Sequence, residues 1–165
     1  YLNFDDERLM NFKVDDFQSR AAFTYGYKGQ NNGIKTAGYY FRDTIKSEET
    51  VFVDAELFVG QYYIGSGVLG DLDLAGKMTL DKYFEFKQNS TRIDWITLES
   101  SNMDFFKEEL QKEHYATCAR IMNNGKLVRE IFKKGSCKMV DLNTEETDLL
   151  FDEKYGKIYS LFFNY

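Results

Sequence analysis

Residues 101–125 read SNMDFFKEELQKEHYATCARIMNNG, and this stretch decides how the rest of the chain is interpreted. Ser101 followed by Asp104 is typical of a helix N-terminus, and Asn124-Gly125 suits the left-handed residue that often ends a helix. Charged residues alternate here with less polar ones. The less polar residues recur at spacings of three or four: Met103, Phe106, Leu110, His114, Thr117, Cys118 and Ile121. This spacing predicts one long helix over about residues 102–123.

The same stretch allows an alternative, in which the helix ends near Glu113 and residues 115–122 form a strand before a hairpin turn. The two cysteines help to decide. In the hairpin, Cys118 and Cys137 would lie two strands apart, at about 9.5 Å and on opposite faces. A disulfide needs Cα atoms within about 7 Å. We therefore favour the long helix, joined to a sheet by a Cys118–Cys137 disulfide.

The rest of the chain is predicted to be rich in short strands, because β-prone runs alternate with glycines and polar turns. Before the helix these runs are Arg20–Tyr27, Ile34–Arg42, Thr50–Val59, Gln61–Ile64, Gly70–Leu80, Lys82–Lys87 and Arg92–Leu98, and after it Leu127–Phe132, Cys137–Leu142, Thr147–Phe151 and Lys157–Asn164. The pattern predicts an α+β fold. It also predicts a single domain over residues 1–165. Its sheet would be mostly antiparallel and curved or barrel-like, with the long helix packed against it.

Charge and hydropathy exclude two classes of protein. The 165 residues include 21 Lys and Arg against 27 Asp and Glu, a net charge of −6. This balance argues against nucleic-acid binding, which requires a basic surface. No apolar run approaches the roughly 18 residues that cross a bilayer, so no transmembrane segment is predicted.

Three features favour an extracytoplasmic or secreted protein. The two cysteines can pair, and Asn89-Ser90-Thr91 fits the N-glycosylation pattern, which makes Asn89 a candidate glycosylation site. The chain also begins at Tyr1 rather than Met, as a processed product or a fragment does. The alternative is a cytosolic fragment with two buried thiols and an accidental sequon.

No catalytic, metal or cofactor site stands out. Residues 65–70 read GSGVLG and match a phosphate-binding glycine pattern, but a strand-like run follows them where a helix is required. The sole histidine, His114, cannot supply the histidine ligands of a zinc site, and one histidine near a predicted helix end does not indicate a catalytic triad. The acidic clusters lack the ligand spacing of a calcium loop. We therefore predict no cofactor, no metal and no enzymatic activity.

Aromatic residues make up 17% of the chain, with 12 tyrosines among them. Core packing explains most aromatics, but tyrosine is also frequent where an apolar surface meets a polar one, as in ligand pockets. The predicted ligand-binding residues are Tyr25, Tyr27, Tyr39, Phe41, Tyr63, Phe84 and Trp95. They predict a carrier or scavenger for a small hydrophobic or amphipathic ligand, with its pocket between the sheet and the helix.

A non-enzymatic interaction protein is the alternative function. Negative charge and surface tyrosines suit a subunit of a surface assembly, or an acidic inhibitor that covers a basic partner protein. Strands at a sheet edge can also pair with a partner's sheet.

Overall fold

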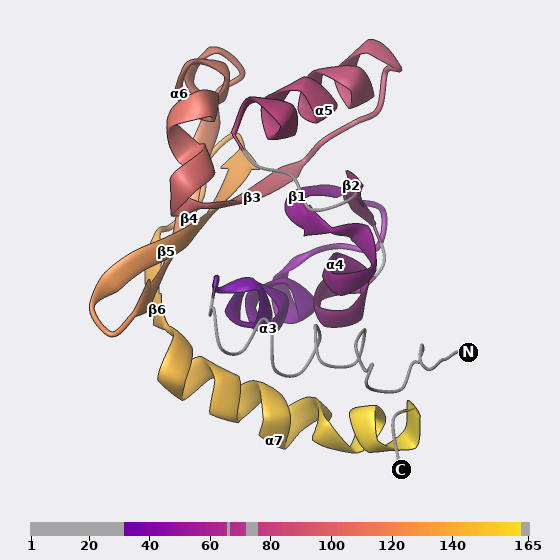
Figure 1. The fold of residues 1–165 in the computed structure, drawn as a ribbon, viewed down its shortest axis with the longest axis vertical. Coiled ribbons are helices and arrows are strands. Elements are labelled where there is room, and N and C mark those ends of the chain that lie inside the picture. The colour runs from indigo at the N-terminus through magenta and orange to yellow at the C-terminus, as the bar shows by residue number, and fades with distance from the viewer. Residues whose placement is uncertain (1–31, 66, 72–75, 163–165) are drawn as a thin grey trace. The chain divides into compact units, whose positions relative to one another are not determined.

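The computed structural model describes residues 32–65, 67–71 and 76–162 (Figure 1). Contacts divide the chain into the units Tyr1–Asn32 and Gly33–Tyr165, and the second unit holds nearly all the described residues. The predicted strand Arg20–Tyr27 lies outside them. A single domain over the whole chain stays a prediction.

The second unit combines five α-helices with a six-stranded sheet among the described residues. The elements in chain order are α3 (Ile34–Thr44), β1 (Val51–Glu56), α4 (Leu57–Ile64), β2 (Val68–Asp71), α5 (Lys77–Gln88), β3 (Trp95–Glu99), the 3₁₀ turn η2 (Ser100–Asn102), α6 (Met103–Lys112), β4 (Tyr115–Asn123), β5 (Lys126–Lys134), β6 (Val140–Asn143) and α7 (Thr144–Phe162). None of these described helices has both the length and the apolar run that a membrane span requires.

The sheet has the strand order β2-β1-β3-β5-β4-β6 and is not closed. Strand β1 is parallel to both β2 and β3, and β4 is parallel to β6, whereas β5 is antiparallel to β3 and β4. A combination of helices and sheet is therefore confirmed. The prediction of a mostly antiparallel or barrel-like sheet is not, because helical crossovers connect β1, β2 and β3 as parallel neighbours.

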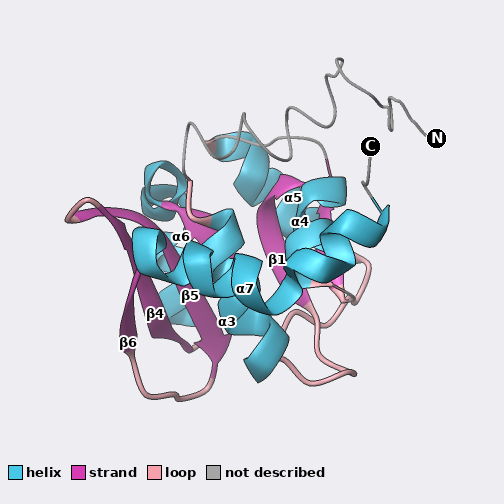
Figure 2. Cartoon of the chain, turned by 90° about the horizontal axis from the view of Figure 1, so that it is seen from below, coloured by secondary structure: helices cyan, strands magenta, loops and turns pink. Residues whose placement is uncertain are grey.

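Helices cover both faces of the sheet (Figure 1). On the face of α5 and α6, Phe52 and Phe132 of the strands pack with Tyr83 and Phe106 of the helices. On the other face lie α3, α4 and α7, and Figure 2 shows α7 and α3 in front of the strands. The core therefore forms two layers, one on each side of the sheet.

The long helix predicted over about 102–123 is wrong in its second half. Helix α6 ends at Lys112, and His114 adopts a left-handed φ of 61° that breaks the helix. The following residues form β4, which turns at Asn124 and Gly125 into β5. The less favoured alternative, a hairpin, is therefore the observed structure. The spacing of Thr117, Cys118 and Ile121 fits a helix, but it also fits a strand with a bulge, so it did not distinguish the two.

The disulfide between Cys118 and Cys137 is nevertheless present, with Cα atoms 5.6 Å apart. A hairpin keeps these residues two strands apart only if the chain after β5 stays beside β5. Instead it crosses to the far side of β4, where Ala119 aligns with Val140. Cys137 thus lies next to β4, and hairpin and disulfide coexist.

Several predicted strands are helices. Residues Ile34–Arg42 belong to α3, Gln61–Ile64 to α4, Lys82–Lys87 to α5, and Thr147–Phe151 with most of Lys157–Asn164 to α7. In α3 the buried residues include Ile34, Ala37 and Phe41, a spacing of three and four that marks a helix buried on one face. The predicted strands Arg92–Leu98 and Leu127–Phe132 are confirmed in β3 and β5, and parts of Thr50–Val59, Gly70–Leu80 and Cys137–Leu142 lie in β1, β2 and β6.

Candidate functional site

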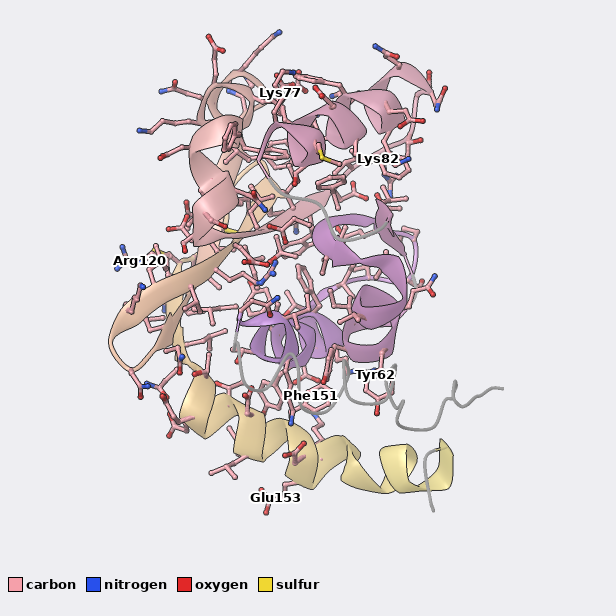
Figure 3. All side chains as sticks on the ribbon, viewed as in Figure 1. Tyr62, Lys77, Lys82, Arg120, Phe151 and Glu153 are labelled. Carbon is pink, nitrogen blue, oxygen red and sulfur yellow. A yellow bond between two sulfur atoms is a disulfide. The ribbon has the colours of Figure 1, made fainter. Side chains whose placement is uncertain are left out.

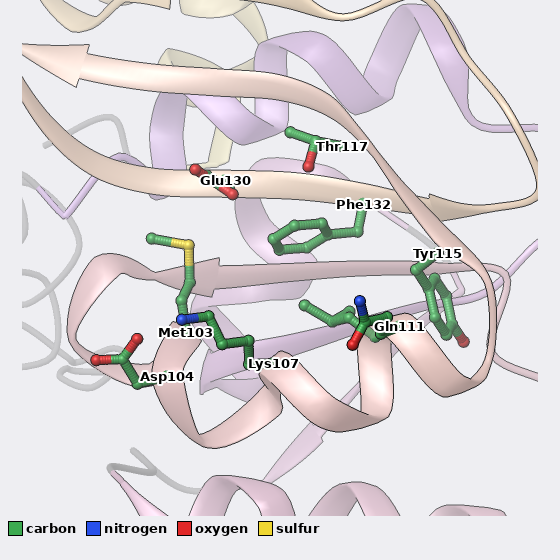
Figure 4. A pocket seen from close by; sticks show the side chains of 9 residues that line it. Met103, Asp104, Lys107, Gln111, Tyr115, Thr117, Glu130 and Phe132 are labelled. Carbon is green, nitrogen blue, oxygen red and sulfur yellow. The ribbon is translucent and has the colours of Figure 1, made fainter.

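A groove of about 540 Å³ lies between α6 and the β4–β5 hairpin (Figure 4). Its lining comes from α6 and from the two strands: Met103, Asp104, Lys107, Leu110, Gln111, Tyr115, Thr117, Glu130 and Phe132. We call this set the α6 groove. It is open to solvent along one side.

Periodicity positions each lining residue. In β5, Glu130 and Phe132 are two residues apart and therefore share the face toward α6. Thr117 of β4 is the cross-strand neighbour of Phe132. On α6, Phe106 is fully buried in the core. The α6 residues that line the groove recur at spacings of three and four, as residues on one helix face do: Met103, Asp104, Lys107, Leu110 and Gln111. The groove thus forms where the edge of a short helix leaves part of the hairpin uncovered.

The groove is apolar in its middle and polar toward its ends. In Figure 4 the ring of Phe132 lies between Glu130, Asp104 and Lys107 on one side and Tyr115 on the other. Phe132 is only 5% exposed. Asp104 and Lys107 are exposed, so their charged groups remain in contact with water.

Glu130 is the half-buried charged group of this site. Burial raises the pKa of its carboxyl group above the ordinary value, although the charge of Arg120 acts to lower it. Arg120 is the cross-strand neighbour of Glu130. Its Nε lies 3.3 Å from Oδ1 of Asp141 on β6, and it extends outward from the strands (Figure 3). Arg120 therefore compensates Glu130 only in part.

Tyr115 closes the other end of the groove. Its hydroxyl donates a hydrogen bond of 2.7 Å to the carbonyl oxygen of Ile93. Burial is the largest of several effects that together raise its pKa to about 12. Since the hydroxyl is already used inside the protein, Tyr115 offers a ligand mainly its ring.

The groove offers contacts of two kinds to a bound molecule. Apolar side chains line the middle, and a carboxylate and an ammonium group lie toward one end, so an amphipathic molecule would find partners for both its parts. Within the described residues, no group of three or more His, Cys, Asp or Glu side chains is placed to hold a metal ion.

The predicted aromatic residues do not line one pocket. Phe41 and Trp95 pack at 5.4 Å between ring centroids, and both are buried in the core on the α3 side. Tyr63 is buried against Phe151 at 5.7 Å. Tyr39 is half-buried on α3, whereas Phe84 is 37% exposed on α5, on the other side of the sheet.

Tyr25 and Tyr27, the remaining two of that set, lie outside the described residues. The predicted ligand-binding residues all precede residue 101, whereas every residue that lines the groove follows it. One signal in the sequence could have indicated the groove. In the correctly predicted strand Leu127–Phe132, Glu130 and Phe132 are two residues apart and therefore place a carboxylate and an apolar ring on the same face. Tyr115 fell within the predicted helix over about 102–123 and was therefore not placed on a strand beside a groove.

A second polar cluster, around Asp54 and Arg129, is not a candidate for ligand binding. Both side chains are 0% exposed. No ligand reaches such groups without a rearrangement of the core, so this cluster has a structural role.

Comparison with known proteins found no match to a family model, to a curated protein or to a solved structure.

Proposed function

We propose that the protein is a non-enzymatic binding protein that holds a small amphipathic molecule in the α6 groove. The observation that carries this proposal is the groove itself, of about 540 Å³ and with an apolar middle. Ligand pockets of proteins are roughly 300–1,000 Å³ and combine apolar walls with a few polar groups. The groove matches that description in size and chemistry.

We place the ligand between the sheet and α6, against lining residues that differ from the aromatic residues expected from the sequence. Leu110 and Phe132 would contact the apolar part of the ligand. Lys107, Gln111 and Glu130 would contact its polar groups. A ligand held in this way remains partly exposed, as suits a carrier or scavenger that must also release it.

A matched pair of variants tests this function. Gln111 lines the groove and Lys112 does not, although both are exposed neighbours on α6. Native mass spectrometry of the natural material would identify a bound ligand, and calorimetry with that ligand would compare Gln111→Trp with Lys112→Trp. We expect the indole at position 111 to change affinity by about tenfold or more. Equal affinities of the two variants, or natural protein with no bound mass and no affinity for amphipathic probes, would contradict the proposal.

We also propose an extracytoplasmic location and a glycan on Asn89. The Cys118–Cys137 disulfide supports the location, because such bonds persist mainly in oxidising compartments. Asn89 is exposed in the turn that follows α5, a position accessible to a glycosyltransferase.

An interaction protein is the second candidate, favoured by the sheet edge at β6. Met139 is 43% and Val140 is 37% exposed there. Edge strands with apolar side chains are typical sites for pairing with another chain. Sedimentation over a range of protein concentrations tests this function. Self-association that Val140→Lys abolishes would support it, and a monomer at every concentration would exclude a self-assembling subunit.

A further inference from the structure

We infer that the α6 groove selects amines, specifically molecules that carry an ammonium group on an apolar or aromatic body. This inference rests on the proposed function and names the class of ligand for the same site. It depends on one residue in particular, Glu130.

The first step is the position of Glu130. Its carboxylate lies beside the apolar middle of the groove, on the same strand face as Phe132. Burial disfavours its charged form, as the raised pKa shows. A charge that has lost water gains more from an opposite charge than an exposed one does. An incoming ammonium group would therefore be stabilised most strongly at this point.

The second step is that the protein's own cations leave this charge incompletely neutralised. Arg120 is shared with Asp141, and Lys107 forms no ion pair within the part of the chain that the structure describes. The lining has two acids, Asp104 and Glu130, against one base. The net charge of −6 further favours the approach of cations over anions.

The third step is the apolar surface next to the carboxylate. Phe132 lies two residues beyond Glu130 on β5, and Leu110 and Met103 of α6 complete the wall. A molecule whose ammonium group pairs with Glu130 would lay its apolar body along this surface. An anion would instead bring its charge toward a half-buried carboxylate, which costs free energy.

Three probes that share a phenylethyl body test the inference by calorimetry near pH 7 on the full chain: 2-phenylethylamine, 2-phenylethanol and 3-phenylpropionate. We expect the amine to bind about tenfold tighter than the alcohol, and the acid to bind most weakly. Glu130→Gln should remove the preference for the amine and leave the alcohol unchanged. Glu108→Gln, an exposed change on α6 outside the groove, should alter nothing.

The outcomes separate the two proposals. Equal binding of amine and alcohol, or tightest binding of the acid with loss on Lys107→Ala, would overturn the inference and leave the binding function intact. Binding of none of the three probes would count against both. The probe series on the unmodified protein gives this answer even if Glu130→Gln fails to fold.

Discussion

Arg129 and Asp54 form an ion pair inside the protein, with Nη1 of the arginine 2.8 Å from Oδ1 of the aspartate and both side chains fully buried. The same Nη1 also donates to the hydroxyl oxygen of Thr97 at 3.2 Å. The pair joins β1 to β5 across the intervening strand β3.

The second carboxylate oxygen of Asp54 organises the chain beyond β3. It accepts hydrogen bonds from the backbone N–H of Glu99 at 2.7 Å and from Nδ2 of Asn102 at 2.8 Å. Asn102 in turn accepts from the N–H of Gly76, just before α5. One buried carboxylate therefore fixes the start of α6 and, through Asn102, the start of α5.

Removal of Asp54 should be strongly destabilising, because the buried charge of Arg129 would lose its short ion pair of 2.8 Å. The ion pair that it would keep, between its Nη2 and Oε2 of Glu99, is longer, at 3.8 Å. For Asp54→Ala we expect a loss of about 3–5 kcal/mol in the free energy of unfolding. Denaturant titration measures this loss. The control is Asp81→Ala, which breaks the exposed Lys77–Asp81 pair and should cost less than about 1 kcal/mol. Similar losses in the two variants would refute a structural role for the buried pair.

The disulfide should contribute measurably to stability. Cys118 and Cys137 are 19 positions apart in sequence, and closing a loop of that length contributes on the order of 3 kcal/mol. The double variant Cys118→Ala, Cys137→Ala should lose about that much in denaturant titration. A reducing agent should destabilise the unmodified protein similarly and leave the variant unaffected. A variant as stable as the oxidised protein would contradict this prediction.

Glu130 should make the stability depend on pH in a defined direction. Its pKa is raised in the folded state by burial, so the folded protein holds this proton more tightly than the unfolded chain does. Stability from this group is therefore present at low pH and is lost as pH rises from about 4, the usual value for glutamate, through the higher folded pKa.

The gain in stability of Glu130→Gln relative to the unmodified protein should consequently grow over that pH window. The charged and titratable groups that share the groove with Glu130 are Asp104 and Lys107 on α6 and, at the other end, Tyr115 on β4. Arg120 is the cross-strand neighbour of Glu130, and the substitution keeps all four groups. Denaturant titrations at several pH values measure the difference. A gain that shrinks with rising pH would contradict the assigned burial of this carboxylate.

Asn89 should carry a glycan when the chain is directed through a eukaryotic secretory pathway. It begins the only Asn-x-Ser/Thr triplet of the 165 residues, and it is exposed. Intact-mass measurement should show a glycan that both Asn89→Gln and Thr91→Ala remove. Secreted protein with the bare polypeptide mass would refute the site.

The hairpin shows what sequence reasoning could and could not resolve. The sequence indicates both the turn at Asn124 and Gly125 and a strand from Tyr115. A Cys118–Cys137 disulfide contradicts that hairpin only while the strand that carries Cys137 is placed beside β5. Local sequence pattern does not determine the order of strands in a sheet. The sequence therefore did not indicate that the chain after β5 returns to the far side of β4.

The helices α3 and α5 show a second limit. Aromatic residues favour strands by propensity, but Phe41 and Tyr83 occupy helical faces buried against the sheet, and tertiary packing overrides propensity. The candidate site was missed for a related reason. Phe132 and Glu130 were correctly placed on one strand. The groove beside them, however, exists only because α6 is short and leaves part of the hairpin uncovered, and the long helix favoured from the sequence did not predict where α6 ends.

The most direct test of the central claim is to map the binding site by NMR. ¹⁵N-labelled protein would be titrated with 2-phenylethylamine, and chemical-shift changes would be followed for each amide. We predict that the changes concentrate in residues 103–117 and 130–132. Changes confined to the surroundings of Phe41 and Trp95, or none at saturating probe, would contradict the assignment of the α6 groove as the functional site.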